Sequence, residues 1–127
     1  MPSSRFGTAI NCIDGRVQAP VAKWLMARYG LDYVDTITLP GPDKAVAEGA
    51  TEVVNEIRDR VGISVQAHGS NVVALAGHHD CATNAATEDE HRKQIVQGLQ
   101  TIRFWNFAVT VVGLWVNADW QVEVVAG

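Results

Sequence analysis

Residues 72–81, with the sequence VVALAGHHDC, decide the fold of this chain. The five apolar residues 72–76 follow one another without polar alternation, which is typical of a strand buried on both faces of a parallel sheet. The chain turns polar after Gly77, so His78 and Cys81 come directly after the strand. In open α/β sheets, sites form beyond the carboxyl ends of the strands. The stretch therefore predicts both a central parallel strand and a site at its end.

A second motif of the same construction lies near the amino terminus. The β-compatible run 6–11 leads into CIDGR at residues 12–16, which places Cys12, Asp14 and Arg16 after a strand. If both motifs serve one site, the first and third strands are neighbours and the second strand lies beyond the first. The shared-site hypothesis therefore predicts the strand order 2-1-3-4-5.

Between and after these motifs, helical and strand patterns alternate. Pro20 is expected to open a helix that places Val21, Trp24, Leu25 and Tyr29 on one face. The further elements are expected as a strand over 33–39, a helix over 43–61, a helix behind the capping box 87–90, and strands over 107–116 and 121–125 around a turn at 117–119. This alternation predicts a single α/β domain over residues 1–127, with an open, mostly parallel sheet, an antiparallel last strand and helices on both faces.

Composition and charge exclude several classes of protein. With 127 residues and 47% hydrophobic content, the chain is long enough for one folded domain. It carries 10 lysines and arginines against 14 acidic residues, a net charge of −4, and no basic run that would follow a nucleic-acid backbone. We find no apolar segment long enough for a signal peptide or a membrane span. We therefore expect a cytoplasmic protein with no nucleic-acid or membrane partner.

The two cysteines indicate metal binding or reactivity more than a disulfide, because the cytosol is reducing. Cys12, His78 and Cys81 together offer two thiolates and one imidazole, which are ligands that zinc prefers. Zinc with three protein ligands keeps a fourth position for water, whose pKa falls to about 7 on the metal. The residues therefore predict a Zn²⁺ site that makes hydroxide at neutral pH. Two buried thiols with a satisfied histidine, or a redox-active cysteine pair, are the alternatives.

The pattern Cys-x-Asp-x-Arg, followed after a helical crossover by His-x-x-Cys, resembles that of the β-class carbonic anhydrases. The resemblance rests on Cys12, Asp14, Arg16, His78 and Cys81, and it spans nearly the whole chain. It implies a twisted α/β domain that forms a homodimer or higher homo-oligomer and binds zinc through the two cysteines and the histidine. It further implies reversible hydration of carbon dioxide to bicarbonate by zinc-bound hydroxide, with Asp14 and Arg16 as the catalytic pair.

The resemblance leaves two roles open for Asp14. Either Arg16 holds the Asp14 carboxylate off the metal, where it orients the zinc-bound water, or Asp14 takes the fourth zinc position and closes the site. The chain also departs from the family pattern, because TLPG at residues 38–41 replaces Arg-Asn-Ala-Gly and Ala82 replaces the glycine after the second cysteine. These departures indicate a minimal, divergent member. Hydrolysis of carbon disulfide or carbonyl sulfide, or a non-catalytic zinc-binding or redox-sensing role on the same fold, stays open as the alternative function.

The remaining histidines and the aromatic residues have plainer interpretations. His79 and Asp80 lie in the loop that follows the third strand and carries Cys81, which we call the metal loop. They either relay protons or form a solvent-facing turn. His68 and His91 are expected on the surface, outside the site. The four tryptophans are expected to fill the core, with some facing a partner subunit: Trp24, Trp105, Trp115 and Trp120.

Overall fold

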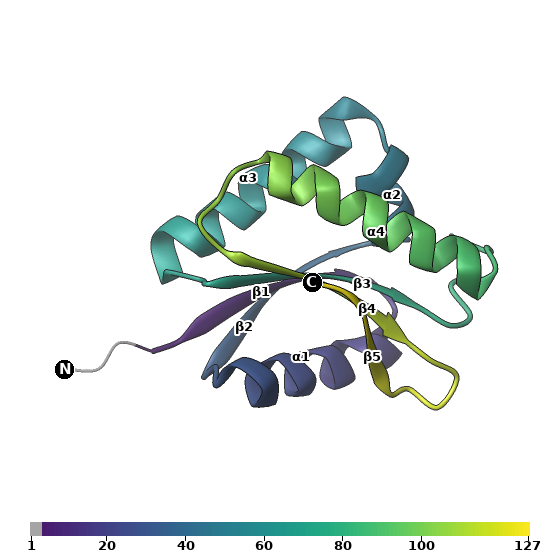
Figure 1. Ribbon diagram of the computed structural model, residues 1–127, viewed down its shortest axis with the longest axis horizontal. Helices are drawn as coiled ribbons and strands as arrows, with labels where there is room; N and C mark the ends of the chain where they lie inside the picture. The colour runs from purple at the N-terminus through teal and green to yellow at the C-terminus, as the bar shows by residue number, and fades with distance from the viewer. Residues whose placement is uncertain (1–3) are drawn as a thin grey trace.

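Five strands form one twisted sheet in the computed structural model, which describes residues 4–127 (Figure 1). Residues 1–3, with which the predicted domain and the segment searched for a signal peptide begin, lie outside the described residues. The elements in chain order are β1 (Phe6–Cys12), α1 (Gly15–Tyr29), β2 (Tyr33–Leu39), α2 (Pro42–Glu48), α3 (Thr51–His68), β3 (Val72–His78), α4 (Glu88–Phe104), β4 (Thr110–Val116) and β5 (Val122–Ala126).

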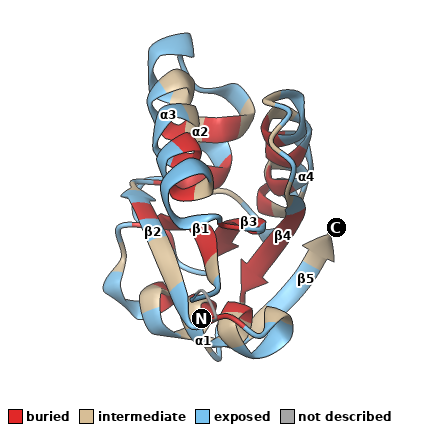
Figure 2. Cartoon of the chain, turned by 90° about the vertical axis from the view of Figure 1, so that its left-hand side faces the viewer, coloured by how far each residue is buried: buried red, intermediate tan, exposed pale blue. Residues whose placement is uncertain are grey.

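The strands are arranged in the order β2-β1-β3-β4-β5. β1 is parallel to both β2 and β3, β3 is parallel to β4, and β5 runs antiparallel to β4 at the edge. α1 covers one face of the sheet, while α2, α3 and α4 cover the other (Figure 1, Figure 2). The predicted strand order, the antiparallel edge strand and the two helical layers are therefore confirmed.

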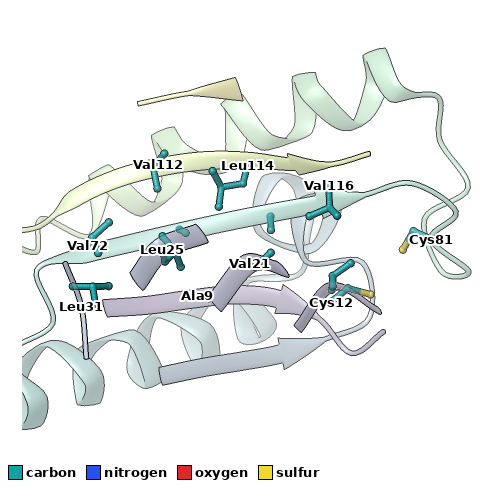
Figure 3. Packing of buried hydrophobic residues seen from close by; sticks show 13 residues of the cluster. Ala9, Cys12, Val21, Leu25, Leu31, Val72, Cys81, Val112, Leu114 and Val116 are labelled. Atoms are coloured by element: carbon teal, nitrogen blue, oxygen red, sulfur yellow. The ribbon is translucent and has the colours of Figure 1, made fainter. Parts of the chain in front are cut away.

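β3 lies at the centre of the sheet, and every one of its residues is buried (Figure 2). On one face, Val72 packs in a cluster with Leu25 of α1 (Figure 3). On the other face, Leu75 packs with Ile57 of α3 and Leu99 of α4. Burial on both faces explains why this strand is apolar throughout. The helices turn their apolar sides to the sheet, and none within residues 4–127 combines the length and hydrophobicity that a membrane span needs.

α1 begins at Gly15, before the proline that the sequence pattern placed at its start. Asp14 is the N-cap, and its Oδ1 accepts a hydrogen bond from the backbone amide of Arg16 at 2.9 Å. Such a cap satisfies one of the amides that a helix start leaves unpaired. Pro20 therefore lies inside the helix, where it removes one hydrogen-bond donor. The predicted start was wrong because the capping aspartate begins the helix earlier.

The helix predicted over 43–61 is interrupted and forms α2 and α3. Gly49 has an extended backbone, with φ −72° and ψ 166°, and its amide donates to the carbonyl of Ala45 at the end of α2. Ala50 is extended as well, and α3 starts at Thr51. The break allows α2 to lie against α4 while α3 packs on β1 and β2. The sequence did not reveal this change of direction, because the apolar residues keep a helical spacing across the break.

The strand predicted over 107–116 begins later, at Thr110. Asn106, just after α4, has a left-handed backbone with φ 65°, so the chain is still turning there. The predicted turn at 117–119 is confirmed, because the Trp120 amide donates to the carbonyl of Asn117 at 2.9 Å. The capping interaction of α4 is confirmed too, since Thr87 Oγ1 accepts from the Glu90 amide at 3.2 Å.

Leu75→Ala tests the two-sided burial of β3. Leu75 is fully buried, so its truncation should lower the free energy of unfolding by about 2 to 5 kcal/mol, measured by urea denaturation. Val96→Ala on α4 is the control, because Val96 is 40% exposed and its truncation should change stability by less than about 0.5 kcal/mol. Equal effects of the two variants would contradict the central position of β3.

Candidate metal centre

Three side chains from the two predicted motifs meet at the carboxyl edge of the sheet. Cys12 is the last residue of β1, and His78 is the last residue of β3. Cys81 lies on the loop that follows β3, and Figure 3 shows both cysteines. One ligand atom from each lies within 4.8 Å of the others, and all three residues are buried. Within residues 4–127, this is the one group of at least three such side chains close enough to hold a metal ion.

The imidazole of His78 has one nitrogen engaged and one free. Nδ1 lies 2.7 Å from the carbonyl oxygen of His79 and donates its hydrogen to it. This bond selects the tautomer in which Nε2 carries a lone pair. Nε2 is buried and has no hydrogen-bond partner among residues 4–127. A buried polar atom without a partner is costly, and a metal ion is a partner that would satisfy it. The donor set therefore fits a metal.

The pKa of the Cys12 thiol is raised, and burial is the largest of several opposing effects on it. Burial raises the pKa of the Cys12 thiol, the backbone amides of Asp14 and Gly41 lower it through hydrogen bonds, and the neighbouring Cys81 raises it again. Both cysteines are free thiols. Cys81 Sγ also lies 3.7 Å from the Thr83 hydroxyl. Two sulfurs that repel each other when ionised favour a cation between them.

Gly41 is the one residue of the segment 38–41 that agrees with the Arg-Asn-Ala-Gly pattern of the family that the sequence resembles. It adopts a left-handed backbone with φ 54°, which glycine tolerates best. A Cβ at this position would lie 3.2 Å from Cβ of Asn84 on the metal loop. The turn after β2 therefore approaches both Cys12 and the loop of Cys81, and this close approach accounts for the glycine.

Asp14 and Arg16 form a closely coupled pair beside the cluster. Arg16 donates from Nη2 to Asp14 Oδ2 at 2.6 Å and from Nε to Oδ1 at 3.0 Å, in addition to its backbone amide. These bonds lower the pKa of the Asp14 carboxyl to about 2. Asp14 is therefore ionised at neutral pH and held by the arginine.

Arg16 itself is positioned by two further contacts. Its guanidinium lies over the ring of Trp120, 4.4 Å from the ring centroid, which is the distance of a cation–π interaction. Nη1 also donates to Asp80 Oδ2 at 3.3 Å. Asp80 and His79 are both exposed, and Asp80 has a left-handed backbone with φ 59°. The loop thus contacts Arg16 through one residue, while His79 contributes its carbonyl to His78.

Some residues around the cluster were not identified from the sequence. Gln18 on α1 donates from Nε2 to the carbonyls of Cys12 and Asp14 and so ties the ligand-bearing segment to the helix. Trp120 contacts Arg16 although the sequence pattern assigned it only a packing or interface role. A single sequence does not indicate these contacts, because neither an isolated glutamine nor a tryptophan in a turn forms part of a recognisable motif.

The prediction that His91 lies on the surface was wrong. His91 is only 2% exposed, and its Nδ1 lies 2.5 Å from Oδ2 of the equally buried Asp43. Its position among the charged residues that open α4 suggested exposure, but that side of the helix turns toward α2. His68 is exposed as predicted, its ring stacks on that of Phe6, and its Nδ1 lies 2.7 Å from Oδ2 of Asp35. Phe6 is the first residue of β1, at the opposite end of that strand from Cys12. The four tryptophans are buried or half-buried.

Comparison with known proteins identifies the family. The family profile described as "Putative carbonic anhydrase" matches residues 2–126. The fold is similar to that of β-carbonic anhydrase isoform I from the protozoan Trichomonas vaginalis, with a TM-score of 0.65 and 13% sequence identity over 99% of this chain and 84% of that one. It is also similar to carbonic anhydrase from Streptococcus mutans, with a TM-score of 0.52 and 16% identity over 98% of this chain and 83% of that one. No curated protein matches the sequence. The chain therefore belongs to the carbonic anhydrase family that this profile describes, as a divergent, β-carbonic anhydrase-like member.

Proposed function

We propose that this protein is a zinc-dependent carbonic anhydrase that hydrates carbon dioxide reversibly to bicarbonate. Cys12, His78 and Cys81 would hold the metal. The observation that carries the proposal is the convergence of these three donor atoms within 4.8 Å, with His78 Nε2 buried and unpartnered within residues 4–127. When bound, zinc lowers the pKa of a coordinated water to about 7 and so supplies a nucleophile at neutral pH. The family match and the names of both structural relatives support carbon dioxide as the substrate.

Asp14 and Arg16 would orient the reacting group. An ionised carboxylate accepts hydrogen bonds and donates none, so Asp14 would hold a neighbouring hydroxyl group with its proton toward the carboxylate. Arg16 holds Asp14 through hydrogen bonds from its Nε, its Nη2 and its backbone amide, and Asp14 is not part of the cluster of possible metal ligands. This arrangement favours the orienting role over the role of a fourth ligand. The pair also fixes the start of α1, so the position of Asp14 is tied to the helix.

The redox alternative explains less of the site. A disulfide between Cys12 and Cys81 would leave the buried Nε2 of His78 without a partner, whereas a metal uses all three side chains. Carbon disulfide or carbonyl sulfide would need the same metal, so the metal site is the part of the proposal to test first. The homodimer and the cytoplasmic location stay predictions from the sequence.

The first test concerns metal content. Protein purified without chelator should contain one zinc per chain, and Cys81→Ser should lose most of it because a serine hydroxyl is not ionised at neutral pH. His79→Ala is the matched control, since His79 is exposed and its backbone carbonyl, which bonds His78, is retained. Elemental analysis by mass spectrometry measures both. Metal-free wild-type protein with a disulfide between Cys12 and Cys81 would favour the redox function instead.

The second test separates the two roles of Asp14. Asp14→Asn keeps a helix-capping oxygen but removes the negative charge. If Asp14 orients the reacting group, this variant should keep its zinc and lose about 10- to 100-fold in kcat/KM for carbon dioxide hydration, measured by stopped flow. Asp59→Asn, whose side chain is 68% exposed and pairs with Arg58 on α3, should change the rate little. A rate for Asp14→Asn at or above that of the wild type would reject the orienting role.

The third test concerns the charge of Asp14 in metal-free protein. Arg16→Gln should raise the pKa of Asp14 from about 2 toward its ordinary 3.8, because Arg16 is the main cause of the depression. Since the folded-state pKa is lowered, the ionised carboxylate stabilises the fold above pH 3.8, and this contribution is lost as the pH falls toward 2. NMR titration of the Asp14 carboxyl carbon measures the value. Arg58→Gln, in a distant exposed pair, is the control, and a wild-type pKa of 3.8 would contradict the coupling.

A further inference from the structure

A second group of buried polar side chains lies next to the proposed metal site, and the proposed function leaves it unused. Asp43 on α2, Asn84 on the metal loop and His91 on α4 are 1%, 4% and 2% exposed. His91 Nδ1 lies 2.5 Å from Asp43 Oδ2, and Asn84 Nδ2 lies 3.1 Å from Asp43 Oδ1. Asn84 Nδ2 also lies 2.7 Å from Oε1 of Gln94 on α4. The group thus joins two helices and the loop.

The hydrogen positions in this group follow from the donor inventory. A carboxylate accepts only, so His91 Nδ1 carries a hydrogen and donates it to Asp43. The two hydrogens of the Asn84 amide then go to Asp43 Oδ1 and to Gln94, while the Lys44 amide donates to Asp43 Oδ1 at 3.0 Å. Both carboxylate oxygens are therefore satisfied inside the protein. Buried networks that are fully satisfied are rigid and define one arrangement of the surrounding chain.

Asp43 touches both ends of the segment that carries His78 and Cys81. Before the segment, Gly77 packs so closely that a Cβ there would lie 2.5 Å from Asp43 Oδ2. After the segment, Asn84 is bonded to Asp43 by its side chain, and its backbone amide donates to the Cys81 carbonyl at 3.4 Å. One buried carboxylate therefore anchors the chain on either side of two proposed ligands.

We propose that Asp43, Asn84 and His91 form a positioning network that holds the loop of residues 78–84 in the geometry that metal binding requires. The inference rests on the proposed metal site, and it assigns the network to the affinity and coordination of the metal rather than to contact with it. None of the three side chains belongs to the cluster of possible ligands. Asn84 links the loop to the helices, and His91 holds the carboxylate to which Asn84 is bonded.

The test uses two pairs of full-length variants. Asn84→Ala removes the link between loop and helices. Gln97→Ala is its control, because Gln97 on α4 bonds the Ala47 carbonyl on α2 and, among residues 4–127, has no side-chain hydrogen bond to the loop. His91→Leu removes the hydrogen donor to Asp43, whereas His91→Asn places an amide donor near the former Nδ1 position. Zinc affinity is measured by competition with a chromophoric chelator, coordination by the absorption spectrum of the cobalt-substituted protein, and folding by urea denaturation of the metal-free protein.

We expect Asn84→Ala and His91→Leu to weaken zinc binding by about 10- to 100-fold and to change the cobalt spectrum. Gln97→Ala should match the wild type, and His91→Asn should recover most of the affinity. Zinc affinities and cobalt spectra equal to the wild type in folded Asn84→Ala and His91→Leu would overturn the inference, even if their metal-free forms unfold at lower urea. If Asn84→Ala does not fold, the comparison of His91→Asn with His91→Leu decides. Failure of the metal proposal itself is distinct, because then the wild type and every variant would lack zinc binding alike.

Discussion

The parallel pairing of β1 with β3 is the contact on which the rest of the structure depends. Its register aligns Thr8 with Val73 and Ile10 with Leu75, and both strands run toward the same edge of the sheet. Cys12 and His78, far apart in sequence, therefore end their strands side by side. An antiparallel pairing would have placed them at opposite edges. The intervening elements α1, β2, α2 and α3 are the crossovers that a parallel pairing requires.

The same topology gathers helix starts at this edge. In a β–α unit the helix begins where the strand ends, so α1 starts beside Cys12, and α2 and α4 start at the two ends of the polar network. The amino terminus of a helix carries a partial positive charge and free amides. Backbone amides of Asp14 and Gly41 indeed hydrogen-bond the Cys12 sulfur. The fold thus supplies donors that partly offset burial, which is the largest effect on the Cys12 thiol and raises its pKa.

The acidic side chains on the two sides of the cluster of Cys12, His78 and Cys81 have different surroundings. Toward solvent, Arg16 holds Asp14 as an ionised acceptor and is itself held by the ring of Trp120. Toward the helices, Asp43 is buried and bonded by His91, so its charge is satisfied inside the protein. The first pair can reach a small molecule, and the second can only act on the chain around it. We therefore propose different roles for these two acidic groups, because their exposure and partners differ.

The sequence by itself determined the sheet, its strand order and the residues that converge. Continuous apolarity over residues 72–76 requires burial on both faces, and the two motifs CIDGR and GHHDC must follow strands to share a site. Local capping was readable at Thr87 but was misjudged at Pro20, because the side-chain cap of Asp14 competes with the proline signal.

Tertiary structure alone decided which polar residues are inside. His91 opens a charged helix and looks exposed, yet it is buried because Asp43, on a helix distant in sequence, offers it a carboxylate. The break at Gly49 turns α2 toward α4 and so allows this contact. The spacing of apolar residues along the sequence does not reveal such a change of helix direction. Partners in such a pair are chosen by packing in space, where a polar group can be buried only if its counterpart arrives from another element.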